Sequence, residues 1–354
     1  MKLGLQLGYW GAQPPEGVGE LVEEAERAGF DAVFAAEAWG SDAFTPLAWW
    51  GHRTSTIRLG TSIVQLSGRT PTSCAMHALT LDHLSNGRMI LGLGVSGPQV
   101  VEGWYGRPFS KPLARTREYV DIIRQVLARK GPVSSEGPHY PLPYAGEGAV
   151  GLGKALKPIV HPLRPDLPIW MGAEGPKNVA LAAEIADGWL PIYFSPRVAD
   201  MYWSWLEEGF ARRRRAPDSA LVRREDFDIA ATVQLVVTDD QAGTERAYDA
   251  MRPWLALYIG GMGAKEQNFH KLVFERMGYE DEAGRIQELY LDGRKEEAAA
   301  IVPDELIAEV TIIGNKDEVR EGVRRWAEAG VTMLILTLST PELIRQAADA
   351  VLDA

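Results

Sequence analysis

The stretch that decides the fold is GRMILGLGVSGP, which spans Gly87–Pro98. Its apolar part, Met89–Val95, holds two glycines and no charged residue. Such a run is typical of a strand that is buried on both faces, as strands of parallel sheets are. The small residues Ser96 and Gly97 then form a loop where the backbone can approach a ligand closely. We therefore predict a barrel strand whose following loop lies at the active site.

The same residues also spell Gly92-x-Gly94-x-x-Gly97, the spacing of a dinucleotide-binding loop. That motif needs its first two glycines in a turn after a strand and its third glycine at the start of a helix. Here the first two glycines lie inside the predicted strand, and Pro98 follows the third with no clean helical period behind it. The pattern therefore favours a barrel strand over a dinucleotide-binding fold.

Apolar runs alternate with helical patterns on both sides of this strand. The runs that we predict as strands are Leu3–Tyr9, Asp31–Glu37, Ile57–Gln65, Met89–Val95, Pro168–Gly172, Gly188–Tyr193, Phe227–Val237 and Val331–Leu338. Alternation of strands and helices indicates parallel strands that are joined by helical crossovers. Eight such units predict an α/β fold, a (β/α)8 TIM barrel, as one domain over residues 1–354.

Two segments interrupt the alternation and are predicted as insertions. Residues 131–165, after strand four, are rich in Gly and Pro, and we expect them to form a lid or hairpin over one end of the barrel. Residues 260–310, after strand seven, have a helical pattern. No linker rich in Pro or Ser divides the chain, so we expect both insertions to belong to the one barrel domain.

Composition narrows the class of protein. The 354 residues are 46% hydrophobic, which is enough for a sizeable core, and the net charge of −11 argues against nucleic-acid and anionic-membrane partners. The single cysteine, Cys74, excludes a disulfide framework. No apolar run approaches the ~20 residues of a membrane span. Met1 and Lys2 lead straight into a strand, so we expect no signal peptide and a cytoplasmic protein.

The chemistry of a barrel lies at the carboxyl ends of its strands. Those ends read Tyr9-Trp10-Gly11, Glu37-Ala38-Trp39, Ser62–Gln65, Ser96–Pro98, Gly172–Pro176 and Pro191–Tyr193. They are mostly small, aromatic and uncharged, which suits a flat and largely neutral ligand. Gly175 and Pro176 open a helix, where the backbone N–H groups of Gly175, Lys177 and Asn178 would face a phosphate. An ordinary capped helix is the alternative.

Other site chemistries have weaker support. His77 and His83 are six residues apart on a predicted helix, so they do not share a face, and the other histidines lack ligand spacing. We therefore predict no metal site. No Gly-x-Ser-x-Gly motif is present, although a Ser-His-Asp triad stays open.

Five phrases, in this order, resemble one known group of proteins. They are Leu59–Ile63 (LGTSI), Asp82–Arg88 (DHLSNGR), Leu91–Gly94 (LGLG), Gly172–Pro176 (GAEGP) and Ala186–Trp189 (ADGW). With these phrases, nearly the whole chain resembles the bacterial-luciferase-like superfamily, and within it the oxidoreductases that use the deazaflavin coenzyme F420. The resemblance implies an insertion-bearing barrel, usually dimeric, with the flavin-like ring over strands three and four.

The resemblance also implies positions for the cofactor. A non-proline cis peptide under the ring maps to Ser62–Ile63, the loop that approaches the ring and ribityl chain maps to Ser96–Gly97, and the phosphate-binding loop maps to Glu174–Pro176. The full set of predicted cofactor contacts is Trp39, Ser62, Ile63, Ser96, Gly97, Gly172, Glu174, Gly175, Pro176 and Asn178.

The chain departs from the deazaflavin sugar dehydrogenases of this superfamily at their acid–base residues. Glu37 stands where they carry an Asp, but Ala38 replaces their catalytic His, and Pro98 and Gln99 stand where they carry a Glu. This disfavours sugar-phosphate oxidation by their scheme. The groups near the ring that remain as proton donors are Glu37, Tyr9, Tyr105 and Tyr193, of which we take Glu37 and Tyr105 as the catalytic candidates.

The leading hypothesis is an F420-dependent oxidoreductase that transfers a hydride between the deazaflavin and a small organic substrate. Reduction of an unsaturated molecule fits the missing acid–base pair better than sugar oxidation does. Two alternatives stay open: an FMN-dependent luciferase-like monooxygenase, and a barrel that binds a flavin without turnover. We expect a homodimer.

Overall fold

The computed structural model describes residues 1–213, 221–263, 265 and 268–352. Its strands are β1 (Lys2–Gly8), β2 (Ala32–Ala35), β3 (Arg58–Thr61), β4 (Val64–Gln65), β5 (Met89–Gly94), β6 (Ile169–Gly172), β7 (Gly188–Leu190), β8 (Asp228–Val237), β9 (Thr311–Gly314) and β10 (Met333–Leu336). The α-helices are α1 (Val18–Arg27), α2 (Phe44–Gly51), α3 (Pro71–Leu84), α4 (Pro98–Gly103), α5 (Pro112–Ala128), α6 (Pro176–Ile185), α7 (Ala199–Arg212), α8 (Gln241–Ala256), α9 (Phe269–Arg276), α10 (Glu280–Leu291), α11 (Lys295–Ala300), α12 (Asp304–Val310), α13 (Lys316–Glu328) and α14 (Pro341–Val351).

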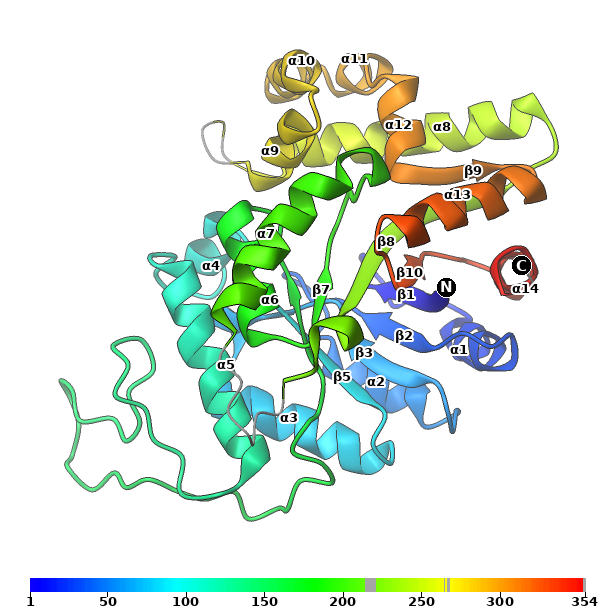
Figure 1. Cartoon of the computed structure of the whole chain (residues 1–354). Coiled ribbons are helices and arrows are strands. Elements are labelled where there is room, and N and C mark those ends of the chain that lie inside the picture. Colours follow the sequence, from blue (N-terminus) through cyan, green and yellow to red (C-terminus); the bar gives the residue numbers. More distant parts are fainter. Residues whose placement is uncertain (214–220, 264, 266–267, 353–354) are drawn as a thin grey trace.

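The sheet closes into a barrel of parallel strands (Figure 1). Its order is β1-β2-β3-β5-β6-β7-β8-β10, and β10 pairs with both β8 and β1, so that Leu334 lies between Ala231 and Leu3. Strand β4 continues the line of β3 beside β5, and β9 pairs only with the far end of β8. The prediction of a (β/α)8 TIM barrel is confirmed, and each of the eight predicted strands overlaps an observed one.

Two aromatic rings fill the inside of the barrel and explain several glycines. Phe34 and Trp170 lie with their ring centroids 5.9 Å apart, among buried aliphatic side chains from five strands. A Cβ on Gly60 would come within 2.3 Å of Phe34, and one on Gly188 within 2.6 Å of Trp170. These strands carry glycine at those positions because a side chain there would overlap the rings.

The larger apolar core lies between the strands and the surrounding helices. It is built from inward faces such as Val22 on α1, Ile123 on α5 and Val323 on α13, each at most 6% exposed. Helix α3 begins as the sequence predicts, with Pro71 at its first position and the Thr70 hydroxyl accepting the N–H of Ser73 at 3.3 Å.

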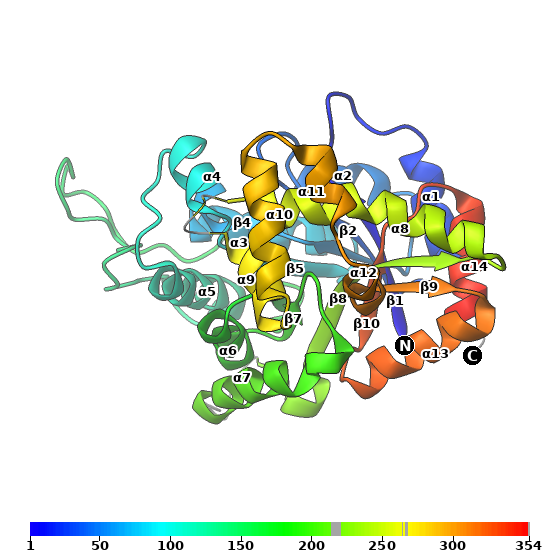
Figure 2. The same ribbon diagram turned by 90° about the horizontal axis from the view of Figure 1, so that it is seen from above.

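The segment after β8 builds a separate layer over the carboxyl ends of the strands. Figures 1 and 2 show α8 to α12 lying across that end, which we call the mouth. This layer has its own apolar core, which includes Ile259, Phe274 and Ile286, and Tyr193 from the end of β7 packs into it. The 260–310 segment is helical, as the sequence predicts, apart from residues 264, 266 and 267, which lie outside the described residues.

The other predicted insertion does not lie over the mouth. Residues 131–165 connect the end of α5 to the start of β6, so they leave the barrel at the amino-terminal end of that strand. They hold two antiparallel bridges, Ser135 with Leu142 and Val133 with Leu156, and project from the body at the lower left of Figure 1. The hairpin character is therefore present, but this segment is an arm and not a lid on the active site.

Among the helices of the described residues, none combines the length and apolarity that a bilayer crossing requires.

Candidate active site

The floor of the mouth is made by Ile63. The peptide bond between Ser62 and Ile63 is cis, as the resemblance implied. The N–H of Ser62 donates to the carbonyl of Ala35 at 2.8 Å, and the carbonyl of Ile63 accepts the N–H of Glu37 at 3.2 Å. A Cβ on Gly94 would lie 2.7 Å from the Ile63 side chain, and one on Gly172 would lie 3.2 Å from it. Strands β3, β5 and β6 therefore meet around one isoleucine, which brings three of the predicted contacts together.

The loop after β5 is shaped by Ser96 and Gly97. Ser96 has a φ of 59°, a left-handed conformation that is uncommon for residues other than glycine. Gly97 precedes α4, and a Cβ there would meet only the side-chain oxygen of Gln99, at 3.3 Å. The loop is thus open on the side of Gly97, as a close backbone approach to a ligand requires.

The loop after β6 ends in the N-terminus of α6. Gly175 is the N-cap residue, no side chain caps it, and a Cβ on it would meet nothing within 4 Å. Its carbonyl accepts the N–H groups of Asn178 at 3.0 Å and Val179 at 2.9 Å. The sequence-based expectation that the N–H of Asn178 faces a phosphate is therefore wrong, because this N–H closes the first turn. The side-chain Oδ1 of Asn178 is buried without a hydrogen-bond partner.

Glu37 is held in a buried ion pair. Its carboxylate is 3% exposed and accepts Arg69 at 2.7 Å and 2.8 Å. Oε1 also accepts the N–H of Gln65 at 3.0 Å. Burial disfavours the charge on Arg69, but the hydrogen bond and charge of Glu37 outweigh it and raise the pKa of Arg69. These contacts commit the carboxylate to Arg69, a residue that the sequence reasoning missed although it stands only four positions after Gln65, the end of the third predicted strand. The catalytic role of Glu37 stays a prediction.

Tyr105 lies beside this ion pair, at a pocket of about 180 Å³. Its hydroxyl donates to the carbonyl of Ala38 at 3.3 Å. Burial and the charge of Glu37 raise its pKa, so the hydroxyl stays protonated at neutral pH. The structure thus brings both catalytic candidates to one pocket, whose lining is Glu37, Ala38, Gly40, Ser41, Asp42, Gly68, Arg69, Trp104 and Tyr105. Trp39, next to this lining in sequence, is 53% exposed.

Comparison with known proteins places this arrangement in a family. A family model described as luciferase-like monooxygenase matches residues 4–333. The chain belongs to this family. A Mycobacterium tuberculosis protein with the name "Putative coenzyme F420-dependent oxidoreductase Rv3520c" is 64% identical over 348 residues, which cover 98% of both chains. The prediction of a luciferase-like oxidoreductase is confirmed.

More distant relatives match most of the length of this luciferase-like chain. The 5,10-methylenetetrahydromethanopterin reductase of Archaeoglobus fulgidus is 28% identical over 316 residues, which cover 89% of this chain and 87% of that one. A solved structure of the coenzyme F420 dependent tetrahydromethanopterin reductase from Methanopyrus kandleri superposes with a TM-score of 0.79 at 24% identity. That match covers 99% of this chain and 98% of the other, and it shows the shared fold.

A second set of polar groups in the luciferase-like mouth lies outside the lining of the Glu37 pocket. Glu174, after β6, places Oε1 2.9 Å from Nδ1 of His270 on α9, although the two atoms are not aligned for a hydrogen bond. Tyr193, after β7, is buried with an unpartnered hydroxyl and has a φ of 58°. His270 was among the histidines that the sequence reasoning set aside, because nothing in the sequence links it to Glu174, 96 residues earlier.

Tyr258 lies close to both His270 and Tyr193. Tyr258 belongs to the π-helical turn Leu257–Gly261, labelled η4, and its ring centroid lies 4.9 Å from that of His270 and 5.5 Å from that of Tyr193.

Among the residues that the structure describes, no group of three or more His, Cys, Asp or Glu side chains is arranged to hold a metal ion.

Proposed function

We propose that the chain is an oxidoreductase that binds the deazaflavin coenzyme F420 at the mouth of the barrel and uses it to reduce a small unsaturated organic molecule. The observation that carries this proposal is the convergence of Ile63, Gly97 and Gly175 at one end of the barrel, with open backbone at both glycines. The relative at 64% identity, whose name includes coenzyme F420, supports the choice of cofactor.

The residues present fit an anionic cofactor at the start of α6. The N–H groups of Gly175 and Lys177 stand at the positive end of the helix dipole, where a phosphate is stabilised. The buried amide of Asn178 has an unpartnered Oδ1, and an amide can be turned so that its NH2 group donates instead. Glu174 is paired with His270, which reduces the repulsion that its carboxylate would exert on a phosphate.

Ile63, at the bottom of the mouth, is the residue on which a flavin-like ring would lie. Ile63 offers an apolar surface, and Gly94 and Gly172 leave the space that its side chain occupies. Bound F420 would supply a hydride from its ring carbon. The protein would orient the substrate and exclude water, since Tyr193, Tyr258 and Phe274 pack ring against ring in the core of the α8–α12 layer that covers the mouth.

Reduction is favoured because the groups that serve alcohol oxidation in related dehydrogenases are missing. Ala38 carries no acid–base group, and Glu37 beside it is already neutralised by Arg69. The neighbouring position after β5 is Pro98, which opens α4 and has no titratable group.

The experiment that tests the proposal compares binding of oxidised F420 and FMN to the purified chain by fluorescence quenching. We expect F420 to bind at least tenfold more tightly, which corresponds to about 1.4 kcal/mol. Preference for FMN would support the monooxygenase alternative, and binding of either cofactor without turnover on a broad substrate panel would support a non-catalytic flavin-binding barrel.

Gly175→Glu then tests the phosphate loop. The new carboxylate would enter the open space at the helix start and repel the phosphate, so we expect F420 binding to be lost while the thermal unfolding midpoint is kept. Gly131→Glu is the matched control, because a side chain at Gly131 also meets nothing within 4 Å but lies on the arm. Equal affinity of both variants would remove the Gly175 loop from the site.

A further inference from the structure

Three polar atoms without hydrogen-bond partners are buried together where the loop after β6, the end of β7 and helix α9 meet. They are Oε2 of Glu174, the hydroxyl of Tyr193 and Nδ1 of His270. Buried polar groups are nearly always paired, because an unpaired one costs about 1–3 kcal/mol. Three such atoms in one cluster, at the mouth of a barrel, indicate a place that is completed by a ligand.

The cluster is held rigidly. The N-cap residue of α9, Asn268, accepts the N–H of Lys271 at 3.0 Å and donates to the carbonyls of Tyr258 at 3.0 Å and Ile259 at 2.8 Å. His270 therefore sits on a helix end that is fixed to η4, and Tyr193 packs against Phe274 of the same helix with ring centroids 4.8 Å apart.

Glu37 and Tyr105, the two catalytic candidates from the sequence, are already committed to other contacts. Glu37 is bound to Arg69, and the Tyr105 hydroxyl donates to a backbone carbonyl. Burial raises the pKa of both Tyr193 and Tyr258 well above the usual value, so their hydroxyls act as hydrogen-bond donors and hold their protons. His270 is the imidazole that contacts a carboxylate at this end of the described barrel, and imidazole is the side chain suited to proton exchange near neutral pH.

We propose that His270, oriented by Glu174, is the group that exchanges a proton with the substrate, and that Tyr193 donates a hydrogen bond to the substrate's polarised oxygen or nitrogen. The substrate class is a neutral molecule with a C=O, a C=N or a carbonyl-conjugated C=C bond. Neutrality follows from the aromatic side chains around the cluster, Tyr193, Tyr258 and Phe274, because an unpaired charge buried among them would be costly. This inference rests on the proposed function, which supplies the hydride.

Reduction of the double bond takes one hydride and one proton. Bound reduced F420 would supply a hydride, with its two electrons, to one atom of the double bond, and the π electrons would move to the other atom. That atom takes a proton from the imidazolium of His270. The imidazole regains a proton from solvent, which reaches it because the side chain is 21% exposed. The substrate is reduced by two electrons and the deazaflavin is oxidised by two.

The groups that face His270 set the pH dependence. They are Glu174 from the loop after β6, Tyr193 from the end of β7 and Tyr258 from η4; on α9 itself, Lys271 is paired with Glu275 at 3.1 Å. Because the reduction consumes a proton that His270 delivers, its rate falls as pH rises.

The test uses the full chain as wild type, His270→Gln and Glu174→Gln, with F420H2 and two probes, cyclohexanone and 2-cyclohexen-1-one. We expect His270→Gln to lower kcat by about 100-fold and to flatten its pH profile, with the dissociation constant of oxidised F420 within twofold of wild type. Glu174→Gln should lower kcat less and displace the pH profile. His139→Gln is the matched control, since its imidazole lies 3.9 Å from Glu118 of α5, in the outer helix layer, and it should change nothing.

The possible results distinguish failure of this inference from failure of the proposed function. A wild-type chain that reduces a probe while His270→Gln keeps the same rate and pH profile overturns the inference alone. A large loss of F420 affinity in His270→Gln also overturns it, because the pair would then hold the cofactor. A wild-type chain that binds no F420 overturns the proposed function and the inference with it. Carbethoxylation of the cofactor-free wild type with diethyl pyrocarbonate, mapped by mass spectrometry, needs no substitution: modification at His270 should leave F420 binding intact and abolish reduction, and intact reduction overturns the inference.

Discussion

Arg69 is the residue on which the buried carboxylate of Glu37 depends. Arg69→Met keeps an unbranched stem but leaves that carboxylate, 3% exposed, without its cation. Removing one partner of a buried pair typically costs 3–5 kcal/mol, so we expect the unfolding free energy to fall by about 3 kcal/mol in urea titrations. Arg117→Met is the control: Arg117 binds Glu184 at 2.7 Å and 2.9 Å but is 50% exposed, and its loss should cost under about 1 kcal/mol. Equal losses would contradict a special role for the Glu37 pair.

Gly94 controls the height of the floor. A Cβ there would lie 2.7 Å from Cδ1 and 2.8 Å from Cγ1 of Ile63, so Gly94→Ala must push the Ile63 side chain into the mouth. We expect overpacking to lower the free energy of unfolding of Gly94→Ala by about 1–3 kcal/mol relative to wild type. We also expect its dissociation constant for F420 to rise by roughly tenfold. Both quantities are to be measured on the same preparation. Ile63→Ala in the same chain removes both clashing atoms, because Cβ of Ile63 is 3.5 Å away, and should recover the stability. No recovery would mean that the clash is not the cause.

Some residues of the candidate site can be predicted from the sequence, and others cannot. Ser62, Gly97 and Gly175 lie at the carboxyl ends of recognisable strands, which converge in a barrel, and the family resemblance predicts them as cofactor contacts. Arg69 and His270 were not predicted, because their importance comes from contacts with Glu37 and Glu174 that no local pattern encodes. Such contacts depend on how separate elements meet, and the sequence alone does not fix that geometry.

At the scale of elements, Glu26 ties α1 to the approach of β3. Its Oε1 accepts the N–H groups of Ser55, Thr56 and Ile57 at 2.8, 2.6 and 2.9 Å. Burial pulls the pKa of Glu26 upward, but these bonds and the Thr56 hydroxyl outweigh it and lower the pKa to about 2. A pKa lowered on folding stabilises the folded state fully above the unfolded pKa, near 4.5, and this stability is lost as pH falls toward 2.

Glu26→Gln should therefore reduce the thermal midpoint most at pH 6, and the gap to wild type should narrow as pH falls from 4.5 to 2. The amide keeps one acceptor oxygen but loses the charge that strengthens the three bonds. Glu20→Gln, on the exposed face of the same helix, serves as the control. A gap that stays constant across this pH range would contradict the assignment.

The elements themselves were predictable where local pattern and tertiary role agree. All eight barrel strands carry apolar runs because both their faces are buried, and α3 and α6 begin at Pro residues. The third predicted strand, Ile57–Gln65, is observed as β3 and β4 with Ser62 and Ile63 between them. The predicted lid over 131–165 was misplaced, because composition shows an irregular segment but not the end of the barrel from which it leaves.

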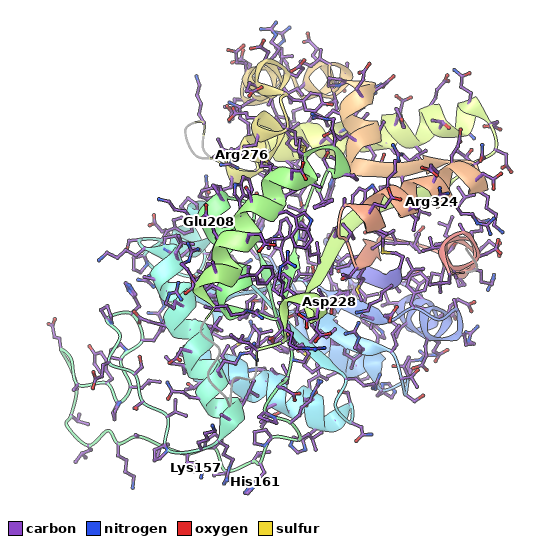
Figure 3. The ribbon with its side chains drawn as sticks, viewed as in Figure 1. Lys157, His161, Glu208, Asp228, Arg276 and Arg324 are labelled. Atoms are coloured by element: carbon purple, nitrogen blue, oxygen red, sulfur yellow. The ribbon has the colours of Figure 1, made fainter. Side chains whose placement is uncertain are left out.

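At the scale of the whole molecule, the two ends of the barrel differ. The mouth is covered by the α8–α12 layer, whereas the arm, residues 131–165, extends outward from the other side (Figures 1 and 2). Lys157 and His161 lie at the bottom of Figure 3, on the part of the arm that returns to the body. Several contacts tie the arm to the body, such as Arg129 Nε to the carbonyl of Pro158 at 2.9 Å, His83 Nε2 with the carbonyl of His161 at 2.8 Å and Arg164 to Asp82 at 2.7 Å.

We propose that the arm mediates a homodimer. It exposes a row of apolar side chains, including Val150 and Leu152 at 85% and Ile159 at 93%, and such a concentration on a projecting segment marks an interface. A second copy fits because α3, beside the arm, exposes Met76 and Leu84, which gives one chain two apolar surfaces for a two-fold contact. Light scattering should give twice the chain mass of 38.9 kDa for wild type and the chain mass for Val150→Asp/Leu152→Asp/Ile159→Asp. Leu291→Asp on α10, also exposed at 47%, should stay dimeric; a dimeric triple variant would place the interface elsewhere.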